Sequence, residues 1–141
     1  MRLVFMLVKD LISKSPFTIN YGSSLFQAAQ IMVEKNVGLL IIVDPDDQRK
    51  VLGVISERDF VKAFSKYKNL ESLKVEDVGT MGNNVITIKQ SDTIARAAQL
   101  MMEHNIRHLV VIDDENKLIG VISVRDIIKI NKILKAILEA H

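Results

Sequence analysis

Cysteine is absent from the 141 residues, which excludes disulfide bonds and thiolate chemistry and leaves the redox compartment unassigned. The chain also lacks a large excess of either charge, because it has 19 basic and 17 acidic residues and its net charge is +2. So small an excess argues against nucleic acid or acidic lipid as the main partner. Lys9 and Asp10 interrupt the apolar run over residues 1–8, so we expect no signal sequence, no membrane span and a cytoplasmic protein.

Motifs of catalysis are missing as well. The chain has no G-x-S-x-G elbow, no phosphate-binding Walker loop and no G-x-G-x-x-G turn. The histidines at positions 104, 108 and 141 show no metal-ligand spacing with acidic residues or with one another. The sequence therefore predicts neither an enzyme, nor a metal site, nor a catalytic cofactor.

The chain does contain one unit twice, and the repeat covers nearly all of it. Residues 18–44 align with 87–113, and residues 51–64 align with 118–131. Of these 41 aligned positions, 17 are identical. Because a long internal repeat marks a structural unit, we expect two domains joined near residues 67–74. The expected domains are residues 1–69 and 70–141.

Each copy predicts the same order of elements, β-α-β-β-α. A short strand precedes an amphipathic helix, which is opened by a capping residue, Ser24 in the first copy or Asp92 in the second. A buried strand, a hairpin partner and a final helix follow. One such unit offers a poor core alone, so we expect an α+β or α/β fold in which the two repeats pack through their sheets with pseudo-twofold symmetry and ligand clefts at the seam. The strands are expected at 16–19, 39–43, 51–55, 85–88, 109–112 and 118–122.

The run "GVISERD" at 53–59 returns as "GVISVRD" at 120–126, and each copy places S-x-R-D where a strand ends and a helix starts. One interpretation is a capping box, in which serine and aspartate bond the free amides of the helix start. The other is a nucleotide site, because a helix start attracts anions, a carboxylate can accept both hydroxyls of a ribose, and arginine pairs with phosphate. Both interpretations stay open. The residues concerned are Ser56, Arg58, Asp59, Ser123, Arg125 and Asp126.

The second copy adds two further residues that could hold phosphate. Arg107 and His108 stand at the start of its buried strand, where the first copy has glycine and leucine at 38–39. A cation there is unusual, since arginine is seldom buried without a partner. The alternatives are a solvated strand entry or an ion pair with Glu103. We therefore expect two clefts of unequal charge.

In this setting the doubled motif is specific, and the sequence resembles a tandem pair of cystathionine β-synthase (CBS) domains, a Bateman module, over nearly all of its length. The resemblance is carried by "VKDLISKSPFTI", "AAQIMVEKNVGLLIIVD" and "LGVISERD", and by "VITI" and "AAQLMMEHNIRHLVVIDDENKLIGVISVRD" in the second copy. It implies binding of AMP, ADP, ATP or S-adenosylmethionine between the repeats. The implied ribose ligands are Asp59 and Asp126, with Ser56 and Ser123 near ribose or phosphate; Thr18, Ile19, Thr87 and Ile88 line the adenine pocket; and Arg58, Arg107, His108 and Arg125 face phosphates.

The sequence thus predicts a non-catalytic sensor. In this hypothesis an adenosyl ligand bridges the repeats and changes the geometry of a homodimer, which an unidentified partner protein reads. The alternatives are a structural or dimerisation module without ligand, and a nucleic-acid-binding protein supported only by scattered lysines. The apolar side of residues 127–138 is expected to pack on its own domain and across the homodimer, with another partner or a membrane surface as alternatives.

Overall fold

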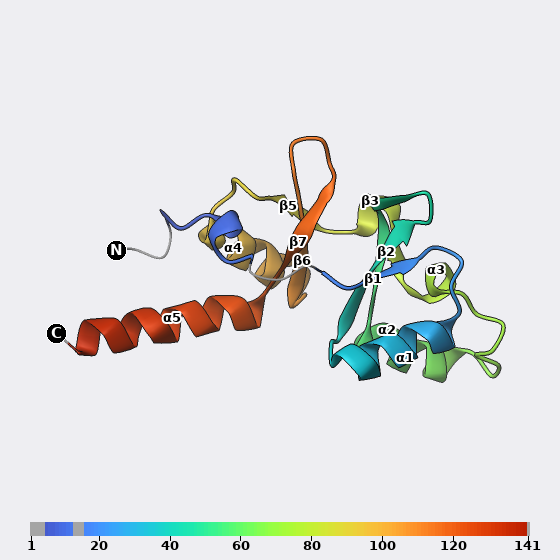
Figure 1. Ribbon diagram of the computed structural model, residues 1–141. Coiled ribbons are helices and arrows are strands. Elements are labelled where there is room, and N and C mark those ends of the chain that lie inside the picture. Colours follow the sequence, from blue (N-terminus) through green and yellow to red (C-terminus); the bar gives the residue numbers. More distant parts are fainter. Residues whose placement is uncertain (1–4, 13–15, 141) are drawn as a thin grey trace. The chain divides into compact units, whose positions relative to one another are not determined.

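The computed structural model describes residues 5–12 and 16–140 and has a mixed α+β fold with two separate sheets (Figure 1). The chain forms two compact units. One unit is Pro16–Val85, and the other combines residues 5–12 with 86–140. Each unit contains the predicted order β-α-β-β-α. Within the described ranges, no helix is both long and apolar enough to cross a bilayer.

The unit Pro16–Val85 is built on a four-stranded sheet in the order β1-β2-β3-β4. β1 runs parallel to β2, and the remaining neighbours are antiparallel. Strand β4 was not predicted, because two residues are too few to show a periodic pattern. Ile19, Leu40 and Ile55 from the sheet pack with Leu25 and Met32 from the first helix. The elements are β1 Thr18–Asn20, α1 Leu25–Lys35, β2 Leu39–Asp44, β3 Asp47–Ser56, α2 Glu57–Lys66, α3 Val75–Val78, β4 Thr80–Met81 and η3 Gly82–Asn84.

The second unit has a three-stranded sheet in the order β5-β6-β7. β5 is parallel to β6, and β6 and β7 form the predicted antiparallel hairpin. Its core joins Ile88, Leu109 and Ile122 with Met101 of the helix between β5 and β6. The elements are η2 Val8–Asp10, β5 Thr87–Lys89, α4 Ile94–His104, β6 His108–Ile112, β7 Leu118–Ser123 and α5 Val124–Glu139.

The helices that follow β1 and β5 begin at different kinds of cap. Ser24 caps α1 as predicted: the Gln27 amide donates to Ser24 Oγ over 3.1 Å. The prediction of Asp92 as the cap of α4 is wrong by one residue, because Thr93 Oγ1 accepts from the Arg96 amide over 3.1 Å. Asp92 lies one residue too early, and its carboxylate accepts from the Lys89 amide instead.

The two lead-in segments are exchanged between the units. Residues 8–12 precede the first repeat in sequence, yet they pack on the second repeat, where Val8 is fully buried and its amide donates to the Asp92 carbonyl over 2.8 Å. Residues 75–79 precede the second repeat, yet they pack on the first, where Val75 is fully buried. The compact units therefore each contain chain from both sides of residue 69.

The exchange explains the glycine of each G-V-I-S run. Gly53 lies under β4, where an added Cβ would collide with the sulfur of Met81 and come within 2.7 Å of the Thr80 carbonyl oxygen. Gly120 lies under the other lead-in, where a Cβ would come within 2.6 Å of an Ile12 methyl carbon. Real Cβ atoms do not make contacts this short, so the close approach of β4 to Gly53 and of Ile12 to Gly120 requires glycine at both positions.

Candidate functional site

The S-x-R-D motif of the first repeat forms the corner between β3 and α2. Ser56 is the last residue of β3, and Asp59 lies in the first turn of α2. The Ser56 amide donates to Asp59 Oδ2 over 2.8 Å, and Ser56 Oγ donates to the same oxygen over 3.1 Å. Both side chains are half-buried, whereas Arg58 is exposed. The aspartate half of the predicted capping box is thus formed here.

The motif of the second repeat forms the equivalent corner between β7 and α5. The Ser123 amide and Ser123 Oγ each donate to Asp126 Oδ2 over 2.9 Å. The Asp126 amide in turn donates to Ser123 Oγ over 3.1 Å, and Arg125 is exposed. In both repeats the cap uses Oδ2 alone, and Oδ1 takes no hydrogen bond from the described part of the chain. Capping therefore leaves one carboxylate oxygen of each aspartate available to a ligand.

The start of the middle strand lies against each corner. In the second unit the Val124 amide donates to the Arg107 carbonyl over 2.9 Å, and His108 pairs with Ser123 in the β6–β7 ladder. The structure therefore places Arg107 and His108 at the same corner as Ser123 and Asp126, and their joint role in ligand binding stays a prediction. Arg107 is exposed and His108 is half-buried.

The residues predicted for the adenine pocket lie in the strands that begin each sheet. Thr18 is half-buried and pairs with Ile41 of β2, while Thr87 is exposed and pairs with Val110 of β6. Ile19 and Ile88 are both buried in the cores of their units. Their contribution to adenine binding stays a prediction, since most of each isoleucine is already covered by protein.

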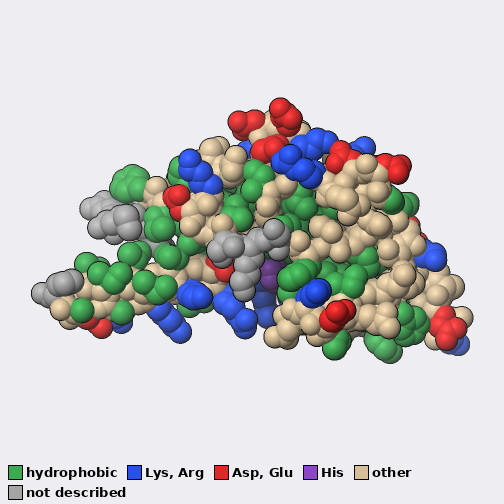
Figure 2. All heavy atoms as spheres, viewed as in Figure 1, with side chains coloured by type: hydrophobic (Ala, Val, Ile, Leu, Met, Phe, Trp, Pro, Cys, Tyr) green, Lys and Arg blue, Asp and Glu red, His purple; other side chains and the backbone are tan. Residues whose placement is uncertain are grey.

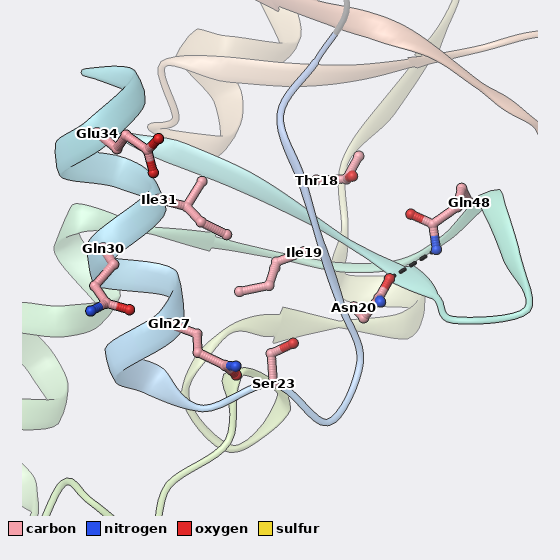
Figure 3. A pocket seen from close by; sticks show the side chains of 9 residues that line it. All are labelled: Thr18, Ile19, Asn20, Ser23, Gln27, Gln30, Ile31, Glu34 and Gln48. Atoms are coloured by element: carbon pink, nitrogen blue, oxygen red, sulfur yellow. Dashed lines mark hydrogen bonds between the residues drawn. The ribbon is translucent and has the colours of Figure 1, made fainter.

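A groove of about 400 Å³ lies between α1 and β1 in the unit Pro16–Val85 (Figure 3). It includes Thr18 and Ile19 but none of the S-x-R-D residues. On its β side, Gln48 Nε2 donates to Asn20 Oδ1 over 2.8 Å. Sequence reasoning missed this groove, because its α1 residues have the pattern of an ordinary solvent-facing helix side. The lining residues are Thr18, Ile19, Asn20, Ser23, Gln27, Gln30, Ile31, Glu34 and Gln48.

Metal binding finds no support in the geometry. Among residues 5–12 and 16–140, no three histidine, aspartate or glutamate side chains lie close enough together to share an ion. Each unit thus has a helix start beside a strand entry, with one carboxylate oxygen of Asp59 or Asp126 unbonded within the described residues.

Comparison with known proteins identifies the family to which the chain belongs. The model of the CBS domain matches residues 8–66 and 75–132. The chain is 36% identical over 107 residues to CBSX3, a mitochondrial CBS domain-containing protein of Arabidopsis thaliana, covering 75% of this chain and 52% of that protein. It spans between 22% and 63% of the length of the first three curated relatives. Several relatives are named as enzymes, and the chain spans 22% to 24% of their length.

Two similar solved structures contain adenosyl ligands. One is a CBS domain protein from Pyrobaculum aerophilum complexed with AMP, with a TM-score of 0.79, 27% identity, and 86% of this chain and 89% of that one covered. The other is the CBS domain pair of protein MJ0100 with 5′-methylthioadenosine and S-adenosyl-L-methionine, with a TM-score of 0.78, 31% identity, and 90% of this chain and 96% of that one covered.

Proposed function

Because the chain belongs to the CBS domain family and carries two of its domains in tandem, we propose that it is a regulatory module that binds adenosyl ligands. The observation that carries the proposal is the doubled corner: each repeat holds an aspartate with one carboxylate oxygen used in the cap and one left open. The AMP, 5′-methylthioadenosine and S-adenosyl-L-methionine complexes of similar CBS proteins support the choice of ligand class.

In this proposal each corner contributes the groups that recognise the sugar. Asp59 and Asp126 accept hydrogen bonds from the ribose hydroxyls through Oδ1, because Oδ2 is already used at the helix start. Ser56 and Ser123 lie one hydrogen bond away and approach ribose or phosphate. Micromolar affinity corresponds to about −8 kcal/mol, which a few charge-assisted hydrogen bonds of about 1.5–3 kcal/mol each and a covered adenine can supply.

The remaining predicted residues contact the two ends of the ligand. Thr18, Thr87 and the isoleucines that follow them border the adenine, and Arg58, Arg107, His108 and Arg125 face the 5′ substituent. Binding stabilises one arrangement of a homodimer, and a partner protein reads that arrangement in the cytoplasm. The module itself is non-catalytic, which agrees with the small share of the enzyme-named relatives that it covers.

Isothermal titration calorimetry tests the proposal directly. AMP, ADP, ATP and S-adenosylmethionine are each titrated into the full chain, and at least one is expected to bind with micromolar affinity. Native mass spectrometry of the same preparation reports subunit number and any nucleotide that co-purifies. If all four ligands give no heat and no mass shift, the regulatory proposal is wrong.

A ligand-free structural module is the second candidate, because Asp59 and Asp126 each accept the amide of the serine at their helix start, as a capping residue does. Under this alternative, Asp59→Ala and Asp126→Ala lower the melting temperature, and no adenosyl compound changes the melting temperature of the wild-type chain. A ligand-induced rise in the wild-type melting temperature that Asp126→Ala abolishes contradicts it.

A further inference from the structure

We infer that the two corners select adenosyl ligands that differ in the charge of their 5′ substituent. The first-repeat corner takes a ligand whose 5′ substituent is neutral or cationic, and the second-repeat corner takes a 5′-phosphorylated one. This inference rests on the proposed adenosyl-binding function and specifies the ligand class of each site. It comes from a difference in side-chain placement between two backbones that are otherwise alike.

In the first repeat, an acidic side chain covers the strand entry. The Glu57 amide donates to the Gly38 carbonyl over 3.1 Å, so the first residue of α2 is fixed beside the start of β2. The Glu57 carboxyl group lies against Gly38: a Cβ at position 38 would be 3.2 Å from Glu57 Cδ and 3.3 Å from Oε1. A side chain at 38 would therefore compete with the carboxylate for the same space.

In the second repeat, both positions have changed chemistry. The Val124 amide makes the same bond, to the Arg107 carbonyl over 2.9 Å. Valine thus stands where Glu57 stands, and arginine stands where Gly38 stands. Compared with the first corner, the second therefore lacks the acidic side chain of Glu57 and has the basic side chain of Arg107. The first corner carries net charge −1 from Glu57, Arg58 and Asp59, and the second carries +1 from Arg107, Arg125 and Asp126.

This difference acts on the 5′ group of the ligand, which extends from the ribose that the neighbouring aspartate is proposed to bind. A 5′-phosphate carries about −1.5 to −2 charge and is repelled by Glu57. A sulfonium or ammonium group is attracted by the same carboxylate, and a neutral thioether is tolerated. Arg107 can give a phosphate two parallel hydrogen bonds, a geometry that favours anions over neutral groups.

The test compares AMP with 5′-methylthioadenosine, which share adenosine and differ at the 5′ substituent. Calorimetry on the full chain is expected to show that Arg107→Ala weakens the tighter AMP-binding event about tenfold and changes 5′-methylthioadenosine affinity less than about twofold. Glu57→Gln is expected to strengthen AMP binding at the weaker site about tenfold and to weaken S-adenosylmethionine there. Arg96→Ala, an exposed arginine near the other end of α4, is the charge-matched control and should change neither.

A gain-of-function variant gives an independent arm. The double substitution Gly38→Arg with Glu57→Val gives the first corner the side chains that stand at Arg107 and Val124 in the second, and Gly38 has a backbone conformation that other residues adopt. The variant is expected to bind two AMP molecules per chain with similar affinity. If Arg107→Ala and Glu57→Gln shift AMP and 5′-methylthioadenosine equally, the charge inference is overturned while adenosyl binding stands. If the wild-type chain binds neither compound, the proposed function itself fails.

Discussion

Asp59 and Asp126 are the residues in which structural and functional demands meet. Their spacing from serine predicted a cap and a ligand site at once, and sequence could not separate the two because both need the same residues at the same positions. The structure resolves this at the level of single atoms: Oδ2 caps the helix and Oδ1 stays open. Glu57 was not predicted to take part, since only the fold brings it against Gly38.

Removing the carboxylates separately tests the predicted inequality of the two sites. Asp126→Ala is expected to weaken binding of AMP more than Asp59→Ala, because the second corner also carries Arg107. Each substitution should also cost about 1 kcal/mol of unfolding free energy through the lost cap. Calorimetry and urea unfolding measure the two effects.

Asp77→Ala is the matched control for these variants. Asp77 Oδ2 accepts from the Lys74 amide over 2.8 Å, which is the distance of the Ser56–Asp59 bond, yet it belongs to no predicted site. Its removal should lower stability and leave ligand affinity unchanged. Equal losses of AMP affinity in Asp59→Ala and Asp126→Ala would contradict the inequality of the corners.

At the scale of elements, periodicity predicted the β-α-β-β-α order of each repeat, and it did not predict η2 or α3, although Val8 and Val75 in them are fully buried. It failed where an element is short or where its partner lies far away in sequence. The two-residue β4 is held by Gly53 and Val54 of β3 rather than by any pattern of its own. α5 was expected to pack on its own domain and across a homodimer. Ile127 near its start packs against the core of its unit, whereas Leu138 near its end is 71% exposed, and packing across a homodimer stays a prediction. Figure 2 shows basic side chains along one side of this helix and hydrophobic ones along the other.

The start of α4 gives a prediction at this scale. Thr93→Ala is expected to cost about 1 kcal/mol of unfolding free energy, because the Arg96 amide loses its acceptor. Asp92→Ala should cost less, since the Asp92 carboxylate bonds the Lys89 amide at 3.4 Å, near the limit of a hydrogen bond. Urea unfolding of the two variants checks the order, and a larger loss in Asp92→Ala would move the cap back to the residue that sequence alone had favoured.

Gly53 and Gly120 give a second prediction at the scale of elements. Gly120→Ala is expected to cost about 1–3 kcal/mol through overpacking, and Ile12→Ala should relieve part of this, because it removes the Cγ2 methyl group that the added Cβ would meet. Gly53→Ala should resist rescue by Met81→Ala, since the Thr80 carbonyl remains 2.7 Å away. A double-mutant cycle by urea unfolding measures both couplings, and no coupling between Gly120→Ala and Ile12→Ala would contradict the contact.

At the scale of the whole molecule, the two-fold repeat was visible in sequence and the exchange of lead-ins was not. The segments "VKDLI" and "VEDVG" that precede the two repeats match each other in sequence. Hydrophobic periodicity reports which side of a segment is covered, and it does not report which unit covers it. Only the structure assigns residues 8–12 to the core of the second repeat and 75–79 to that of the first.

Two fragments of nearly equal length test this exchange. Residues 16–85 contain one complete compact unit, whereas residues 1–69 contain the first sequence repeat without the segment that covers it. The fragment 16–85 is expected to unfold cooperatively in urea. The fragment 1–69 should be less stable by at least about 1.5–3 kcal/mol, the contribution of a fully buried valine such as Val75. Circular dichroism against urea measures both, and equal midpoints would contradict the assignment.

The compact units of the structure therefore do not have the same boundaries as the two sequence repeats. A circularly permuted chain that starts at residue 16 and joins the original ends through a flexible linker would make both folding units continuous. In such a chain each compact unit would be formed by one uninterrupted segment, and the two units would follow one another in sequence. Any signal that depends on the exchange of the two lead-in segments would then be lost, while each unit kept its own S-x-R-D corner.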